Sequence, residues 1–255
     1  MSNTTKIALI TGATSGIGKA TAELLLNNGY RVILTGRRIE LLNELKEKFP
    51  VGSVHTLCFD IRNSQETESA LNSLPAEWKS IDVLVNNAGL AWGLSQFYDG
   101  KIDHWDTMID TNIKGLLYVS RIVAGWMKEA QSGHIVNIGS IAGKEVYSNG
   151  NVYCATKHAV DALTKAMRIE MSPFNVRVTG VHPGAVETEF SIVRFDGDME
   201  KAKSVYQGFE NLVAEDIADA ILYCISRKPH VNINDLVIMP TAQPVASVIH
   251  RKSTN

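Results

Sequence analysis

The residues best suited to chemistry in this sequence are a tyrosine and a lysine four positions apart. Tyr153 and Lys157 lie in a segment with helical periodicity, so their side chains share one face of the helix. A free tyrosine titrates at about pH 10, too high for a base at neutral pH, but a neighbouring ammonium favours the phenolate. The pair is a candidate general acid–base unit, although the same spacing also occurs on exposed helix faces.

Two polar residues could complete this unit. Ser140 closely follows the apolar run 134–138, and its hydroxyl could orient a substrate oxygen; a turn-forming serine is the alternative. Asn112 falls inside a predicted helix over 105–129, where asparagine is not favoured. It could hold a water that passes protons to Lys157, or it could be an exposed or interface polar residue.

A glycine-rich loop near the N-terminus is typical of a phosphate-binding turn. It follows a predicted strand at 6–11 and opens a predicted helix at 19–28, with the spacing G-x-x-x-G-x-G. Glycines let the backbone approach a pyrophosphate, and the helix N-terminus supplies free N–H groups. A purely structural turn is the alternative. The expected cofactor contacts in this loop are Gly12, Thr14, Ser15, Gly16, Ile17 and Gly18.

Two arginines after the second predicted strand distinguish between the nicotinamide cofactors. NAD-binding folds place an acidic residue there to hold the ribose 2′-hydroxyl, whereas this sequence has Arg37 and Arg38. Guanidinium groups fit a 2′-phosphate, which a carboxylate would repel. The sequence therefore predicts NADP as the cofactor, with a pair of solvated surface arginines as the alternative.

Two further strand ends are expected to line the same crevice. Asp60 follows the run 54–59 and could accept a hydrogen bond from an adenine amino group, cap the next helix, or do both; Ile61 lies beside it. The fourth apolar run ends in small and amide residues where a cofactor would pass, namely Asn87, Ala88 and Gly89.

Short apolar runs alternate with longer amphipathic segments along the whole chain. Runs that are apolar on both faces, separated by helices, indicate an α/β fold: a Rossmann-type doubly wound parallel sheet of about seven strands with helices on both faces. No composition shift marks a boundary, so residues 1–255 are expected to form a single domain. Within it we expect a substrate lid at about 185–212 and a C-terminal tail at about 241–255.

The composition excludes several classes of protein. The 255 residues include 25 basic and 27 acidic ones, a net charge of −2, so the basic surface of a nucleic-acid-binding protein is not expected. No apolar run approaches the roughly 20 residues of a membrane span, and the apolar run near the N-terminus is too short for a signal peptide. Three scattered cysteines without metal-ligand spacing favour a cytoplasmic setting and no metal site.

Taken together, the motifs resemble those of the short-chain dehydrogenase/reductase family. They stand in that family's order and at its usual separations over nearly the whole chain: the glycine loop 11–18, the segment 86–89, Asn112, Ser140, the segment 153–157 and Pro183-Gly184.

The family resemblance implies a nicotinamide-dependent oxidoreductase with four catalytic residues. Tyr153 would accept the proton and Ser140 would position the substrate. Lys157 would hold the nicotinamide ribose, and Asn112 would support the proton relay. A segment after the sixth strand would lie along the nicotinamide, with Pro183, Gly184, Val186 and Thr188.

Other segments resemble the NADP-dependent 3-hydroxy acid dehydrogenases. They are 35–38, 150–153, 189–195, 229–234 and 239–240. That subgroup converts L-serine, L-allo-threonine and acids such as 3-hydroxyisobutyrate to 3-oxo acids, or catalyses the reverse reduction, and is usually a homotetramer.

A 3-hydroxy acid carries a carboxylate, which needs a cation or hydrogen-bond donors in the substrate pocket. Arg194 in the expected lid is the candidate anchor because a bidentate fork suits a carboxylate, and a solvent-facing lid residue is the alternative. Lys144, just past Ser140, competes for the same role, and the sequence does not choose between them.

Three other functions fit the sequence. A reductase of the same family could act on a sugar, steroid or acyl ketone, although a flat or greasy substrate would need a more apolar lid. A non-catalytic NADP-binding regulator would not need the complete set of four catalytic residues. A scaffold protein could use the two long helices predicted over 105–129 and 152–171, but their apolar faces fit core or subunit packing equally well.

Overall fold

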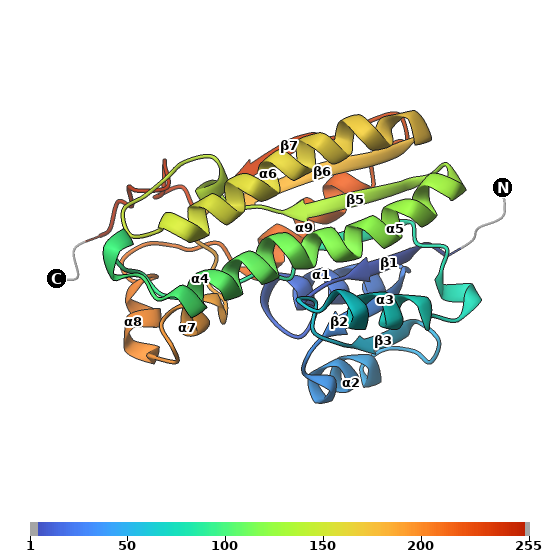
Figure 1. The fold of residues 1–255 in the computed structure, drawn as a ribbon, viewed down its shortest axis with the longest axis horizontal. Coiled ribbons are helices and arrows are strands. Elements are labelled where there is room, and N and C mark those ends of the chain that lie inside the picture. Colours follow the sequence, from blue (N-terminus) through green and yellow to red (C-terminus); the bar gives the residue numbers. More distant parts are fainter. Residues whose placement is uncertain (1–4, 253–255) are drawn as a thin grey trace.

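The molecule is built around a parallel sheet with the predicted number of strands. The computed structural model describes residues 5–252, and in that range seven strands lie in the order β3-β2-β1-β4-β5-β6-β7 (Figure 1). The order reverses between β1 and β4, which places a ligand crevice at their carboxyl ends. The strands are β1 (Ile7–Ile10), β2 (Arg31–Gly36), β3 (Val54–Cys58), β4 (Val83–Asn86), β5 (Gly133–Ile138), β6 (Val176–Pro183) and β7 (Asp235–Ile238).

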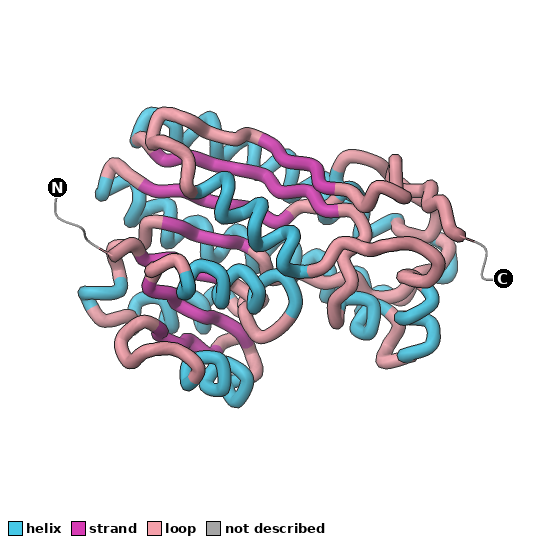
Figure 2. Tube along the Cα trace, turned by 180° about the vertical axis from the view of Figure 1, so that it is seen from behind, coloured by secondary structure: helices cyan, strands magenta, loops and turns pink. Residues whose placement is uncertain are grey.

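Helices cover both faces of this sheet, as Figures 1 and 2 show from opposite sides. Side chains of a strand alternate between the faces. Ala8 and Ile10 of β1 therefore pack against α1, α2 and α9, whereas Ile7 and Leu9 pack against α3, α5 and α6. The helices are α1 (Gly16–Asn27), α2 (Ile39–Glu47), α3 (Ser64–Asn72), α4 (Ile102–Ile109), α5 (Leu116–Ala130), α6 (Asn151–Met171), α7 (Phe190–Arg194), α8 (Met199–Ser204) and α9 (Ala214–Ile225). Across residues 5–252, no helix is long and apolar enough to cross a bilayer.

The helix predicted over 105–129 is not continuous. α4 ends at Ile109, α5 begins at Leu116, and a π-helical turn, η3 (Asp110–Gly115), joins them. Asn112 lies in this turn, and its side-chain amide hydrogen-bonds the backbone of Leu90 (2.8 Å) in the loop after β4. The regular α-helical hydrogen bonding is therefore interrupted at Asn112, whose side-chain amide binds the loop after β4. Such π-helical turns are frequent at functional sites.

The segment 185–212, predicted to be irregular, contains the two short helices α7 and α8. Its two ends are joined by backbone hydrogen bonds, from Leu212 to Ala185 (3.2 Å) and from Glu187 to Leu212 (2.8 Å). The chain after β7 runs back against this segment, where Lys252 donates a backbone hydrogen bond to Gly208 (2.7 Å). Segment and tail therefore lie together, beyond the carboxyl end of β6.

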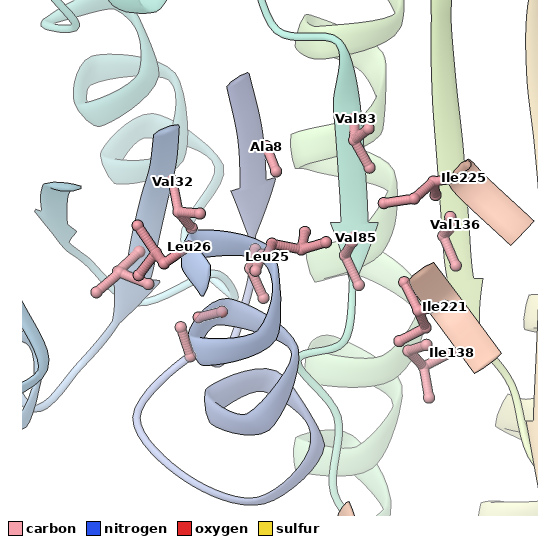
Figure 3. Close-up of a cluster of buried hydrophobic side chains, with 14 of the residues drawn as sticks. Ala8, Leu25, Leu26, Val32, Val83, Val85, Val136, Ile138, Ile221 and Ile225 are labelled. Atoms are coloured by element: carbon pink, nitrogen blue, oxygen red, sulfur yellow. The ribbon is translucent and has the colours of Figure 1, made fainter. Parts of the chain in front are cut away.

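Leu25 of α1 offers a test of the packing between α1 and the sheet. It is 0% exposed, and Figure 3 shows it beside Ala8 and Val85. The change Leu25→Ala removes buried methyl groups and leaves a cavity, so the free energy of unfolding should fall by about 2–5 kcal/mol. The control Leu117→Ala, at a side chain 37% exposed, should change it by only about 0.5 kcal/mol. Guanidinium denaturation measures both, and equal losses would contradict this packing.

Candidate active site

A cleft of about 580 Å³ lies at the carboxyl ends of the strands and collects nearly all the predicted site residues. Gly18 and Asn112 do not line it but support its wall. The predicted residues that line it are Gly12, Thr14, Ser15, Gly16, Ile17, Arg37, Arg38, Asp60, Ile61, Asn87, Ala88, Gly89, Ser140, Tyr153, Lys157, Pro183, Gly184, Val186, Thr188 and Arg194.

The glycine loop has a backbone that other residues rarely adopt. Gly12 and Gly16 have φ values of +66° and +52°, in the left-handed region that favours glycine. A Cβ at Gly18 would collide with the carbonyl oxygen of Gly12 and the side-chain amide of Asn87. That amide donates hydrogen bonds to the carbonyls of Thr11 (2.9 Å) and Gly12 (3.1 Å). The loop therefore opens α1 with its backbone held close to the end of β4.

Arg38 lies against the glycine loop. Its guanidinium donates to the hydroxyls of Thr14 (2.8 Å) and Ser15 (3.1 Å) and forms an ion pair with Glu189 (3.3 Å) at the start of α7. Arg37 is more exposed, and its guanidinium lies 3.9 Å from a carboxylate oxygen of Asp60. Two cations thus stand at the mouth of the cleft, at the end of β2.

Asp60 is held by a neighbour that the sequence did not single out. The guanidinium of Arg62 donates to both carboxylate oxygens of Asp60 at 2.6–3.0 Å, and these bonds hold the pKa of Asp60 below its usual value. The alternative role of Asp60 as a helix cap is wrong. Asn63 caps α3 instead, accepting from the backbone N–H groups of Gln65 and Glu66.

Tyr153 and Lys157 lie together on α6, and both are buried at the bottom of the cleft. The ammonium of Lys157 lies 5.9 Å from the centre of the Tyr153 ring and donates to the carbonyl of Ile138 (3.0 Å). Burial lowers the pKa of Lys157 to about 8. Burial also raises the pKa of Tyr153, and this outweighs the hydrogen bond of Ser140 and the charge of Arg194, which lower it. The lowered tyrosine pKa expected from the sequence is therefore not found in the protein alone.

Ser140 has the turn-forming role weighed from the sequence, and its hydroxyl lies near Tyr153. Its hydroxyl oxygen accepts the backbone N–H of Ala142 (3.1 Å) and so caps a short turn, η4 (Ile141–Gly143). The hydroxyl donates to the carbonyl of Pro183 (3.5 Å) and lies close enough to Tyr153 to lower the pKa of that phenol. Its turn-forming role therefore fixes the hydroxyl beside the tyrosine.

Asn112 is buried rather than exposed, and its side-chain amide is hydrogen-bonded to the protein. It is 2% exposed. Its oxygen accepts from Leu90 N–H (2.8 Å), while its nitrogen donates to the Leu90 carbonyl (2.8 Å) and to the Thr156 hydroxyl (3.0 Å). Asn112 therefore joins the loop after β4 to α6.

Arg194 lines the cleft, whereas Lys144, the other candidate carboxylate anchor, does not. Its guanidinium donates to the Tyr147 hydroxyl (2.9 Å) and lies 5.6 Å from the ring centre of Tyr153. Its buried Nε has no hydrogen-bond partner among residues 5–252. Lys144 does not line the cleft, because its ammonium pairs with Asp161 (2.6 Å) on α6.

Sequence reasoning missed several residues that line the substrate end of the cleft. Tyr147 and Phe190 flank Tyr153, with the Phe190 ring edge-on at 5.7 Å. Ala246 and Ile249 reach the cleft from the chain after β7. These contacts join segments far apart in the sequence, and no motif or spacing signals them.

The doubly wound sheet, the glycine loop and the Tyr153–Lys157 pair together define a dinucleotide-binding fold with an acid–base group in its crevice. Residues 6–198 match the short chain dehydrogenase family. The chain belongs to this family, and the resemblance inferred from the motifs is confirmed.

Similar proteins extend over nearly the whole chain. An NADP-dependent 3-hydroxy acid dehydrogenase of Salmonella typhi is 47% identical over 247 residues, which are 96% of this chain and 99% of that protein. One from Schizosaccharomyces pombe is 44% identical over 252 residues, 97% of each protein. The structure of the closed form of serine dehydrogenase complexed with NADP+ matches with a TM-score of 0.92 at 45% identity, covering 96% of this chain and 100% of that chain.

The buried ammonium of Lys157 gives a pH-dependent stability. Its pKa is about 8 in the folded protein against the usual 10.5, so between about pH 8 and pH 10 the unfolded chain binds more protons. Without cofactor, stability should rise by about 2 kcal/mol over this window relative to the variant Lys157→Met. Urea denaturation at several pH values measures the difference. The exposed control Lys228→Met should keep the rise, and a wild-type curve parallel to that of Lys157→Met would refute the assignment.

Proposed function

We propose that this protein is an oxidoreductase that uses NADP to oxidise the 3-hydroxyl of small 3-hydroxy acids to 3-oxo acids, or catalyses the reverse reduction. The observation that carries the proposal is the Arg194 guanidinium, 5.6 Å from the centre of the Tyr153 ring. A cation beside the acid–base residue fits a substrate with a carboxylate close to its hydroxyl. The names of the similar proteins, NADP-dependent 3-hydroxy acid dehydrogenase and serine dehydrogenase, support the same activity.

The cofactor half of the cleft fits NADP. The glycine cradle of Gly12, Gly16 and Gly18 leaves backbone open beside the α1 N-terminus, where a pyrophosphate is favoured. Arg37 and Arg38 at the end of β2 would hold a 2′-phosphate. When bound, NADP supplies the acceptor for the hydride in oxidation and the donor in reduction.

The chain's own residues would handle the proton. Tyr153 takes it from the substrate 3-hydroxyl, and the Ser140 hydroxyl beside it orients the substrate oxygen. The ammonium of Lys157 favours the phenolate and would hold the nicotinamide ribose. Asn112 acts by position, since its amide fixes the loop after β4 against α6.

Features of the cleft disfavour the other candidate functions. The half-buried guanidinium of Arg194 beside Tyr153 would be unfavourable opposite a flat or greasy ketone, because its charge would lack a partner. A regulator that only binds NADP has no need of Tyr153, Ser140 and a buried Lys157 in one place.

The finer assignments belong to the same proposal. Segment 185–212, which carries Arg194, would act as a lid over the substrate, supported by the chain at 241–252 in a single catalytic domain.

A homotetramer would cover exposed apolar side chains on the outer helices, such as Ile102 (63% exposed) and Ile169 (75%). We propose a cytoplasmic location from the free cysteines.

The substrate assignment is tested with 3-hydroxyisobutyrate and its methyl ester, which share a carbon skeleton but differ in charge. With NADP, kcat/KM should favour the acid by about 10-fold or more, because Arg194 offers charge-assisted hydrogen bonds. Arg194→Leu should abolish this preference. Tyr153→Phe should still bind NADP and lose turnover. An ester oxidised as well as the acid by the wild-type protein would defeat the proposal.

The cofactor assignment is tested by the double change of Arg37 and Arg38 to Gln. Loss of two charge-assisted contacts should lower kcat/KM with NADP about 100-fold, while the value with NAD should change by no more than about threefold. The control Arg121→Gln alters an exposed residue of α5 and should change neither value. A parallel loss with both cofactors would show that the arginines do not read the 2′-phosphate.

A further inference from the structure

Two hydrogen-bond donors at the substrate end of the cleft have no acceptor among residues 5–252. One is the buried Nε of Arg194, whereas Nη2 of the same guanidinium donates to the Tyr147 hydroxyl (2.9 Å). The other is that hydroxyl, which accepts from Arg194 while its own proton is bonded to nothing in this part of the chain. Because the two groups are in contact, one small anion could accept from both.

The backbone just before α6 seats the ring of Tyr147. A Cβ at Gly150 would collide with this ring, so a larger residue there would displace it. The backbone N–H of Gly150 also donates to the carbonyl of Tyr147 (3.1 Å), which closes the turn. The Arg194 guanidinium lies 5.6 Å from the ring centre of Tyr147 and 5.6 Å from that of Tyr153. The hydroxyl of Tyr147 is therefore placed at the acid–base residue as well as at the cation.

The Tyr147 hydroxyl keeps its proton at neutral pH. Burial raises the pKa of Tyr147 above its usual value, and this outweighs the charge and hydrogen bond of Arg194, which lower it. A neutral phenol can accept one hydrogen bond and donate another at the same time. Tyr147 is thus a donor even while it accepts from Arg194.

The other hydroxyls beside Arg194 and Tyr153 already donate within the protein. Tyr206 donates to the carbonyl of Val186 (3.0 Å), which leaves Ser191 as the donor in the bond of 2.6 Å between their hydroxyls. The Ser140 hydroxyl donates to a backbone carbonyl at 3.5 Å.

The side-chain amide of Gln243 also lines the cleft, but it contacts a different segment. Its oxygen accepts the backbone N–H of Ala185 (2.8 Å), and a Cβ at Gly184 would collide with it. In the range that the structure describes, it makes no hydrogen bond to Arg194 or Tyr147. Tyr147 is therefore the hydroxyl in direct contact with the candidate carboxylate anchor.

We propose that the Tyr147 hydroxyl is a second donor to the substrate carboxylate, beside the guanidinium of Arg194. This inference rests on the proposed function, in which Arg194 holds that carboxylate. A carboxylate accepts at two oxygens, so it can take the Nε proton and the phenol proton together. Tyr147 would bind and orient the substrate, while proton transfer stays with Tyr153. The role is the same for serine and for 3-hydroxyisobutyrate, because both carry the carboxylate.

The change Tyr147→Phe keeps the ring and removes the hydroxyl. Loss of a charge-assisted hydrogen bond should lower kcat/KM for 3-hydroxyisobutyrate about 10-fold, chiefly through KM, because the proton-transfer residues are unchanged. The value for its methyl ester should fall by no more than about threefold, since a neutral acceptor makes a weaker bond. The control Tyr98→Phe, at a residue 82% exposed and outside the cleft, should change neither value.

A double variant separates donation to the substrate from support of Arg194. In the Arg194→Leu background there is no guanidinium for Tyr147 to hold. A direct donor nevertheless predicts a further fall of about fivefold or more in kcat/KM for the acid when Tyr147→Phe is added. Calorimetry with propionate and the NADP-loaded protein needs no turnover, and Tyr147→Phe alone should raise the Kd about 10-fold.

Three results would overturn the role of Tyr147 and leave the proposed function standing. They are no loss in Tyr147→Phe, no further loss in the Arg194→Leu background, and an equal loss for the acid and the ester. The last would show a general defect of the site rather than a lost contact with the carboxylate. A wild-type protein that oxidises the ester as well as the acid would instead overturn the proposed function.

Discussion

The buried ammonium of Lys157 is the constraint on which the rest of the site depends. Lys157 is 6% exposed, and its Nζ donates to one backbone carbonyl, that of Ile138 at the end of β5. Burying a charge is costly unless polar groups surround it. The backbone of α6 at this residue is also closely packed, since a Cβ at Gly143 would collide with the backbone carbonyl of Lys157.

This constraint ties together three parts of the chain. The end of β5 accepts the ammonium, α6 carries it, and the loop after β4 passes close to it. Asn112 strengthens the arrangement, because its amide joins Leu90 in that loop to Thr156 on α6. The chain departs from regular α-helix in the π-helical turn that contains Asn112. Tyr153, one helical turn before Lys157, is positioned by the same contacts.

The substrate end is positioned less directly. Arg194 stands on a short helix outside the sheet, and two distant loops hold it: Tyr147 accepts from its guanidinium, and the backbone N–H of Gly93 donates to its carbonyl (2.9 Å). The cation is therefore aligned with Tyr153 by contacts from both sides of the cleft. The cofactor half of the cleft is therefore built on strand ends, and the substrate half on loops and a short helix.

Most of the fold could be predicted from the sequence because it rests on local patterns. Buried parallel strands appear as apolar runs, and the ends of such strands meet at one edge, so the sequence alone places Gly12, Asp60 and Ser140 in one crevice. The π turn could not be predicted, since it follows from a hydrogen bond between Asn112 and a residue 22 positions away.

Long-range contacts also explain what the sequence left open or missed. The choice between Arg194 and Lys144 as the candidate carboxylate anchor depends on Asp161. This residue lies 17 positions after Lys144 and accepts a hydrogen bond from its ammonium. The pKa of Tyr153 depends on how deeply it is buried, and no spacing along the chain reports that. Glu189 does not add a negative charge at the substrate end, because its carboxylate forms an ion pair with Arg38 across the cleft.

The most direct test of this account is the ionisation of Tyr153 in the protein with and without NADP+. Ultraviolet difference titration of wild type against Tyr153→Phe isolates the phenolate signal of this one residue. In the free protein, burial should hold the pKa of Tyr153 above its usual value. A cationic ring and the Lys157 ammonium beside the phenol favour its anion, so binding of NADP+ should lower that pKa by at least about one unit. A pKa that stays the same or rises when NADP+ binds would contradict the role of Tyr153 as the proton acceptor.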